Sequence, residues 1–293
     1  MSLKILFSPG DKVWIEDPQY PLLRAATRTQ DIVPVFVPVD KEGFNLQKAL
    51  EIDPTAKGVF LTPSHQCPLG MMTSIQRRRD ILQWASESGG WIVEDDYDSE
   101  LRYGGNLAYP SLQGMDSGNN VIYIGTFSKS LFPGLRLGYM VVPDDLVKAF
   151  SGMRFLIDRQ SNEILQLSVA EFIKTGLYET HLLKMRRIFE ARRDYLIEAV
   201  SDNFGDWGKF IATGQGMHMT FVFNNPDIDD EAVADLCRRQ GVELRSISSF
   251  STGRPLYKGL IMGFGHFPPA QLLAAVSRIG FVLRDKFAAF GPA

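Results

Sequence analysis

The chain has 293 residues, of which 45% are hydrophobic and 22% charged, and its formal net charge is -3. This composition is typical of a globular protein with one large domain and a smaller one, and it excludes a broad basic nucleic-acid surface. No apolar run is long enough to cross a membrane. Cys67 and Cys237 lie far apart in the sequence, so we expect no disulfide framework and predict a reducing, cytoplasmic location.

The first half of the chain alternates strand-like and helix-like segments. The predicted strands are Val13–Glu16, Ile32–Val39, Lys57–Leu61, Trp91–Val93 and Val121–Ile124, and the predicted helices end at Arg28 or cover Asn45–Leu50 and Ser74–Ser88. This alternation predicts an α/β fold with a mostly parallel sheet covered by helices on both faces. In such sheets, the loops at the carboxyl ends of the strands build the functional site.

The second half begins with helices and then returns to mixed structure. The predicted helices are Asp145–Met153, Asn162–Thr175, Thr180–Val200, Asp230–Gln240 and Ala270–Lys286, and the predicted strands are Met217–Phe223, Val242–Arg245 and Leu260–Phe264. The third helix carries four arginines, Arg186, Arg187, Arg192 and Arg193. A basic helix of this kind is more often a solvated face than a DNA-binding one.

Lys129 lies in a loop between two predicted core strands, the second of which is Gly138–Val142. The loop also holds Thr126, Ser128, Ser130 and Arg136. Burial disfavours a charged ammonium, and a neutral amine attacks aldehydes. Hydroxyl groups and a guanidinium suit a phosphate. From spacing alone, however, a surface lysine on a turn is the more common explanation.

The segment Glu94–Glu100 carries five carboxylates in seven residues. Such a run is usually a solvated acidic turn. It follows a predicted buried strand directly, so we expect its first members to be partly buried. Two further segments, Glu16–Tyr20 and Thr62–Gly70, also come after predicted strands or at their ends.

These four segments, taken in chain order, resemble the motifs of fold-type I enzymes that use pyridoxal phosphate (PLP). More narrowly, they resemble the aminotransferase-like domain of MocR-type transcriptional regulators of the GntR superfamily. The resemblance implies the fold of PLP-dependent transferases of fold type I. It implies a large PLP-binding domain at residues 1–160, bridging helices at 161–201 and a small C-terminal α/β domain at 202–293.

The resemblance also implies roles for individual residues. Lys129 would bond the aldehyde of PLP, Asp95 would pair with the pyridinium nitrogen, and Tyr97 would donate to the ring 3-oxygen. Asp96 competes for the role of Asp95, and spacing alone does not separate the two. Tyr20 would stack on the ring, although a half-buried core tyrosine is an equal alternative. Thr126, Ser128 and Arg136 would bind the phosphate. Ser64 or His65 would lie near the ring.

Two functions are compatible with this resemblance. The first is an effector domain that binds PLP and an amino acid or amine, forms a homodimer, and controls DNA through an N-terminal winged-helix domain outside this chain. The second is a free-standing aminotransferase that moves an amino group between an amino acid and a 2-oxo acid. The stretch Lys258–Gly265 lacks the arginine that such enzymes use for the substrate carboxylate, and neither Arg245 nor Arg254 is placed by sequence alone. This absence favours the effector domain.

Two departures from the family pattern affect the expected site. Cys67 stands where many aminotransferases have an asparagine, and nothing in sequence marks it as a nucleophile. The resemblance also places a Gly-rich phosphate-binding helix start upstream of the chain. We therefore expect this chain to bind PLP weakly.

Overall fold

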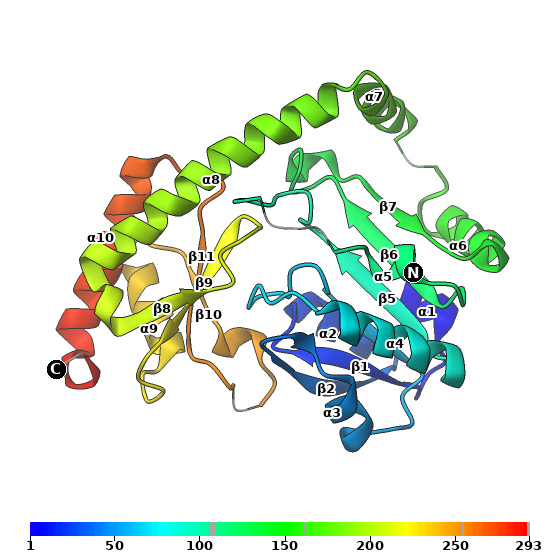
Figure 1. Cartoon of the computed structure of the whole chain (residues 1–293), viewed down its shortest axis with the longest axis horizontal. Helices are drawn as coiled ribbons and strands as arrows, with labels where there is room; N and C mark the ends of the chain where they lie inside the picture. The colour runs from blue at the N-terminus through cyan, green and yellow to red at the C-terminus, as the bar shows by residue number, and fades with distance from the viewer. Residues whose placement is uncertain (106–108, 161, 254, 292–293) are drawn as a thin grey trace. The chain divides into compact units, whose positions relative to one another are not determined.

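The computed structural model describes residues 1–105, 109–160, 162–253 and 255–291. The chain divides into two compact units (Figure 1). The first unit comprises Met1–Gln66, Met71–Glu100 and Leu107–Leu183, and the second comprises Cys67–Gly70, Leu101–Asn106 and Lys184–Ala293. Each unit has a sheet and a hydrophobic core of its own.

The first unit is built on a seven-stranded sheet in the order β3-β2-β1-β4-β5-β6-β7. Its strands are β1 (Lys12–Asp17), β2 (Val33–Asp40), β3 (Gly43–Phe44), β4 (Gly58–Leu61), β5 (Trp91–Asp96), β6 (Val121–Thr126) and β7 (Gly138–Val141). The five inner strands pair in parallel, whereas β3 and β7 pair antiparallel at the two edges. The α/β fold with a mostly parallel sheet is thereby confirmed.

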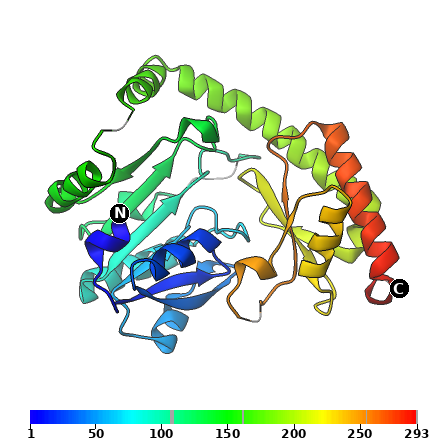
Figure 2. The same ribbon diagram turned by 180° about the vertical axis from the view of Figure 1, so that it is seen from behind.

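Helices cover both faces of this sheet, which Figures 1 and 2 show from opposite sides. The helices are α1 (Ser2–Leu6), α2 (Pro21–Arg28), α3 (Leu46–Ile52), α4 (Ile75–Ser88), α5 (Leu112–Met115) and α6 (Val147–Asp158). One core packs α3, α4 and α5 against Trp14 and Ile92, and the other packs α1, α2 and α6 against Ile15 and Val93. Successive residues of β1 and β5 thus enter opposite cores, as expected for strands buried on both faces.

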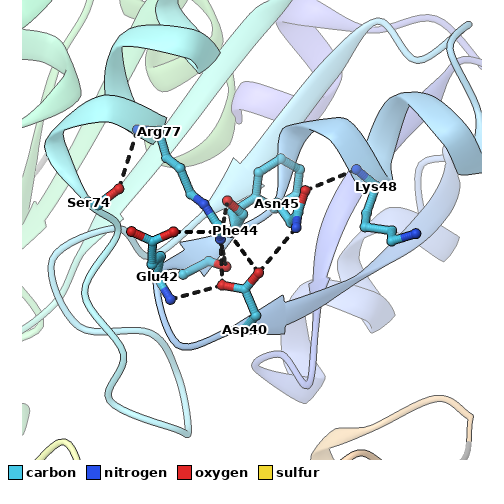
Figure 3. Close-up of polar contacts among 8 residues, drawn as sticks. Asp40, Glu42, Phe44, Asn45, Lys48, Ser74 and Arg77 are labelled. Atoms are coloured by element: carbon cyan, nitrogen blue, oxygen red, sulfur yellow. Dashed lines mark hydrogen bonds and ion pairs between the residues drawn. The ribbon is translucent and has the colours of Figure 1, made fainter.

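Helix α4 is held at its start by a polar cluster on one edge of the unit (Figure 3). The Ser74 hydroxyl accepts a hydrogen bond from the Arg77 backbone at 3.4 Å and caps the helix. The Arg77 guanidinium binds both Asp40 oxygens at 2.6 and 2.7 Å, a fork that ties α4 to the end of β2. Gly43 has a φ of +86°, and a Cβ there would lie 2.4 Å from the Thr73 hydroxyl, so only glycine fits this turn.

The last helices of the first unit are α7 (Glu163–Lys174) and the first residues of α8 (Leu177–Phe204). Helix α7 begins after Asn162, whose side chain accepts a hydrogen bond from the Leu165 backbone. Helix α8 is continuous over 28 residues. Its first residues, up to Leu183, group with the first unit, and the rest group with the second.

The second unit contains a four-stranded antiparallel sheet in the order β10-β11-β9-β8. Its elements are β8 (Gly208–Ile211), β9 (His218–Phe223), α9 (Asp230–Arg239), β10 (Arg245–Ser246), β11 (Gly259–Gly263) and α10 (Pro269–Lys286). One core joins the inner residues of β9 and β11, such as Phe221 and Leu260, to α8, α9 and α10. The division into domains at residues 160 and 201 stays a prediction.

Most predicted elements are present within a few residues, and two differ in kind. Val242–Arg245 was expected to be a strand, but only Arg245–Ser246 pairs, because the chain turns after α9. Gly138–Val142 was expected to be a core strand, but β7 is an exposed edge strand in which Tyr139 and Val141 are about 40% exposed. Within the described residues, no helix is both long and apolar enough to span a bilayer.

Candidate functional site

Most of the predicted site residues lie on one edge of the seven-stranded sheet. Strands β1, β4, β5 and β6 run parallel, so their carboxyl ends meet at this edge. The predicted residues at or just after these ends are Tyr20, Ser64, Asp95, Tyr97, Thr126, Ser128 and Lys129. Arg136 lies farther on, after the 3-10 turn Pro133–Leu135.

The acidic segment at the end of β5 is largely buried and hydrogen-bonded. Glu94 is fully buried, and its two oxygens accept the backbone N–H groups of Leu112 and Gln113, each at 3.0 Å. The Asp96 carboxylate accepts the Tyr123 hydroxyl at 2.8 Å and both the hydroxyl and the N–H of Ser99, at 2.6 and 3.1 Å. The expectation of partial burial is therefore confirmed, since these carboxylates do not form a solvated turn.

Asp95 differs from its two neighbours. Its side chain is half-buried, and no hydrogen bond or ion pair from another described residue to its carboxylate is found. Burial, followed by the charges of Asp96 and Asp98, raises the pKa of Asp95 to about 6. A desolvated carboxylate without a partner is suited to a cation placed beside it. Asp96 is less suited to this role, because its two oxygens already accept three hydrogen bonds.

A second perturbed carboxyl lies at the end of β1. Glu16 is 3% exposed, and its Oε2 atom accepts the hydroxyl of Thr62 at 2.8 Å and the N–H of Thr62 at 3.1 Å. Its other oxygen is buried and has no hydrogen-bond partner among the described residues. Burial raises the pKa of Glu16 to about 7, and the charge of Asp95 acts in the same direction. Sequence reasoning missed Glu16, although its position at a strand end beside a buried proline turn was a usable signal.

His65 forms a buried group with two residues that follow β5. Its Nδ1 atom lies 2.9 Å from each oxygen of Asp98, and both side chains are 2% exposed. The Tyr97 hydroxyl lies 3.1 Å from the same Nδ1 atom. The rings of His65 and Tyr97 stack, with centroids 5.7 Å apart and planes 26° apart. Ser64 is half-buried beside this group in sequence.

A fully buried arginine fixes the segment that carries Ser64 and His65. The Arg78 guanidinium donates to the carbonyls of Pro63, Thr73 and Pro110 at 2.7, 3.0 and 3.0 Å. It also lies 3.8 Å from the buried carboxylate of Glu94. One side chain therefore holds three segments of chain around the acidic strand end.

The Lys129 loop is held mainly by contacts of Ser130 with the start of α8. Ser130 is buried, its hydroxyl accepts the Tyr178 hydroxyl at 2.9 Å, and its carbonyl lies 2.9 Å from His181 Nε2. Both partners come from the first turns of α8. On the near side, the Thr126 hydroxyl accepts the Ser128 N–H at 3.1 Å. These contacts hold a tight turn with polar groups at its tip.

The side chain of Lys129 is exposed. This agrees with the surface lysine on a turn that spacing alone favours. Arg136 is also exposed and adopts a φ of +50°, and Tyr20 is 46% exposed. The stacking of Tyr20 on the ring stays a prediction beside the half-buried alternative.

In the second unit, the arginine-free stretch is strand β11 with its flanks. Arg245 lies opposite Ile261 in the β10–β11 register, so the two side chains share one face of the sheet. Arg245 is exposed and lies over the Phe250 ring. Arg254 lies outside the described residues. On β9, the buried Thr220 hydroxyl donates to the Pro68 carbonyl at 2.6 Å and so anchors the segment that contains the half-buried Cys67.

No metal site accompanies these groups in the described ranges. Within residues 1–105, 109–160, 162–253 and 255–291, no three side chains of histidine, cysteine, aspartate or glutamate gather as metal ligands. The site therefore offers carboxylates at one strand end, hydroxyls and an amine at the next, and a histidine between them.

Comparison with known proteins identifies relatives of this arrangement. The sequence model for "Aminotransferase class I and II" matches residues 2–261. The chain is 35% identical over 274 residues to the HTH-type transcriptional regulator YdeL of Bacillus subtilis, covering 94% of this chain and 58% of YdeL. It is 33% identical over 276 residues to the probable rhizopine catabolism regulatory protein MocR of Rhizobium meliloti, covering 94% of this chain and 55% of MocR.

Solved aminotransferases share the fold. The kynurenine aminotransferase of Pyrococcus horikoshii superposes with a TM-score of 0.87 at 26% identity, covering 96% of this chain and 71% of the enzyme. That enzyme was crystallised with PMP. The chain spans little more than half the length of the two curated regulators.

Proposed function

Because the chain belongs to the aminotransferase class I and II family, we propose that it is the PLP-binding effector domain of a MocR-type regulator of the GntR superfamily. The observation that carries this proposal is that two regulators align with 94% of the chain, whereas the chain covers only 58% and 55% of them. The remaining length of such regulators would hold a DNA-binding winged helix. The likeness to aminotransferases is compatible with a free-standing enzyme but does not favour one.

Pyridoxal phosphate is the cofactor of this fold family, and the acidic end of the site fits its ring. When bound, PLP supplies an electron-withdrawing pyridinium that stabilises negative charge on a substrate carbon. The unpartnered carboxylate of Asp95, which burial and nearby charges disfavour in its ionised form, would accept the pyridinium N–H. Tyr97 would donate to the ring 3-oxygen. Asp96 would keep its structural bonds to Ser99 and Tyr123.

The Lys129 loop would hold the other end of the cofactor. The Nζ atom of Lys129 would bond the aldehyde carbon, and the hydroxyls of Thr126 and Ser128 with the guanidinium of Arg136 would bind the phosphate. Tyr20 would cover the ring face, and Ser64 would line the side of the ring. These side chains fit the charges of PLP, since the anionic phosphate would lie against hydroxyls and a guanidinium, and the cationic pyridinium against a carboxylate.

The domain would sense an amino acid or amine rather than turn one over. The stretch Lys258–Gly265 offers no guanidinium for a substrate carboxylate, and Arg245 beside it is engaged over Phe250. A carboxylate without a bidentate partner is poorly oriented, and a misplacement of about 1 Å costs on the order of a hundredfold in rate. The proposal includes a homodimer acting in the cytoplasm on DNA through the winged helix of the whole regulator.

The first experiment is to add PLP to the chain, reduce with borohydride and map the modified peptide. We expect a single adduct on Lys129, which the Lys129→Ala variant loses and the Lys174→Ala variant on α7 retains. An adduct on a different lysine would refute the assignment of the site. If binding of the phosphate also needs residues upstream of this chain, the affinity of the full regulator for PLP should exceed that of this chain by orders of magnitude.

The second experiment separates sensor from enzyme. The loaded protein is mixed with a panel of amino acids, and conversion of PLP to pyridoxamine phosphate is followed in a single turnover. We expect binding with little conversion. Fast conversion that continues over many turnovers with a 2-oxo acid would replace the sensor by an aminotransferase.

A further inference from the structure

His65 and Asp98 form a buried ionisable pair near the site, each 2% exposed, and the proposed function gives neither a role in holding the cofactor. A carboxylate has no hydrogen to donate, so the two 2.9 Å contacts to His65 Nδ1 need a hydrogen on that nitrogen. The pair therefore selects one tautomer of the imidazole. This matters because the Tyr97 hydroxyl lies 3.1 Å from the same nitrogen.

An Nδ1–H group cannot accept a hydrogen bond, so Tyr97 cannot donate to it. The Tyr97 oxygen instead accepts, and it shares the Nδ1–H group with the two oxygens of Asp98, as N–H groups in proteins commonly do with more than one acceptor. The stacking of the two rings keeps the hydroxyl at this position. The hydrogen of the Tyr97 hydroxyl is then directed away from His65.

We propose that His65 and Asp98 are positioning residues that turn the Tyr97 hydroxyl into a hydrogen-bond donor for an anionic oxygen of the ligand. With PLP bound, that oxygen is the ring 3-oxygen, and this part of the inference rests on the proposed function. The hydrogen on Nδ1 also polarises the Tyr97 O–H bond, because a hydroxyl that accepts a hydrogen bond donates a stronger one. In this role Asp98 acts through His65, and His65 acts through the Tyr97 hydroxyl.

The first test needs no cofactor. In a 15N-labelled chain, the ring-nitrogen shifts and their long-range couplings to carbon-bound hydrogens report which nitrogen of His65 carries hydrogen. The signals of His181, His218 and His266 are assigned by substitution. Hydrogen on Nδ1, with or without hydrogen on Nε2, supports the proposal. Hydrogen on Nε2 alone overturns it, because Tyr97 would then donate to Nδ1.

The second test uses a matched pair of variants in PLP-loaded protein. His65→Asn places an amide N–H near the position of Nδ1–H, whereas His65→Phe keeps a ring against Tyr97 but has no donor. We expect His65→Asn to retain the visible band of the bound cofactor. His65→Phe should shift that band and raise the Kd for PLP about tenfold, the value of one good hydrogen bond.

A double variant separates positioning from simple packing. If His65 acts through the Tyr97 hydroxyl, adding Tyr97→Phe to His65→Phe should change the Kd and the band little further. Additive effects, or a His65→Asn variant as impaired as His65→Phe, would overturn the proposal. If the wild-type chain takes up no PLP, the proposed function fails, while the nitrogen shifts still decide the tautomer.

Discussion

The end of β5 and the loop after β6 are neighbouring parts of the same sheet edge, yet they are built differently. At the end of β5, the carboxylates of Glu94, Asp96 and Asp98 are buried and each accepts hydrogen bonds from fixed partners. In the loop after β6, Lys129 is exposed, and the strongest brace is the attachment of Ser130 to α8. The fold therefore sets the shape and charge of the acidic end before any ligand arrives, and it leaves the lysine end adjustable.

The largest expected effect comes from breaking the brace behind the acidic end. Arg78→Met removes three hydrogen bonds to carbonyls and leaves Glu94 buried without its cation. Removal of one partner from a buried ion pair costs about 3–5 kcal/mol. Urea unfolding should show this loss, and Arg79→Met, at the exposed position next to it, should change the free energy of unfolding by less than about 0.5 kcal/mol. Equal losses in the two variants would contradict the assigned brace.

A smaller loss is expected from Asp96→Asn. The substitution weakens three hydrogen bonds to Ser99 and Tyr123, and an amide at this position meets two hydroxyls and an N–H with only one acceptor. Hydrogen bonds to charged groups are worth about 1.5–3 kcal/mol, so we expect the free energy of unfolding to fall by about 2 kcal/mol at pH 7.

Asp95→Asn should show no such loss of stability without cofactor, yet it should weaken PLP binding more than Asp96→Asn does. If the absorption spectrum of bound PLP changes only in the Asp96→Asn variant, then Asp96 rather than Asp95 pairs with the pyridinium nitrogen.

A pH-dependent gain in stability is expected from Glu16→Gln. Because its pKa is raised in the folded chain to about 7, the folded state holds a proton on Glu16 that the unfolded state releases above its ordinary value of 4.5. Glu16 therefore costs no stability below pH 4.5, its cost grows between pH 4.5 and about 7, and it stays constant above that range. Unfolding free energies should show the variant more stable than the wild type by about 3 kcal/mol at pH 8. The two chains should converge at pH 4.5, and a constant difference across this range would rule out the titration.

The smallest effect is expected in the lysine loop. Tyr178→Phe removes the hydrogen bond from the Tyr178 hydroxyl to Ser130 and keeps the ring. The free energy of unfolding should fall by about 0.5–1 kcal/mol. Amide hydrogen exchange should accelerate at Ser128, Lys129 and Ser130 and stay unchanged at the end of β5. Faster exchange at both places would show that the two regions open together.

Sequence alone predicted the fold and the strand ends because both depend on local patterns. Alternating apolar runs gave the parallel sheet, and the carboxylates of Asp95 and Asp96 follow directly from the buried strand Trp91–Asp96. The exposure of Lys129 follows the general preference of lysines for the surface, whereas the position of β7 at the edge of the sheet was missed, since it depends on strand pairing across the whole sheet. The pairs His65–Asp98 and Arg78–Glu94 were also missed, because each joins segments that only the folded chain brings together.

The buried guanidinium of Arg78 also bears on the thermodynamics of ligand uptake. A loop that becomes ordered only on binding loses conformational entropy at that moment and buries apolar surface, which gives a large negative heat-capacity change. The segment of Ser64 and His65 is already tied down through the Pro63 carbonyl at 2.7 Å, so this entropy is lost when the chain folds. Titration calorimetry of a ligand at the acidic end should accordingly give a heat-capacity change that is small and an enthalpy that varies little with temperature.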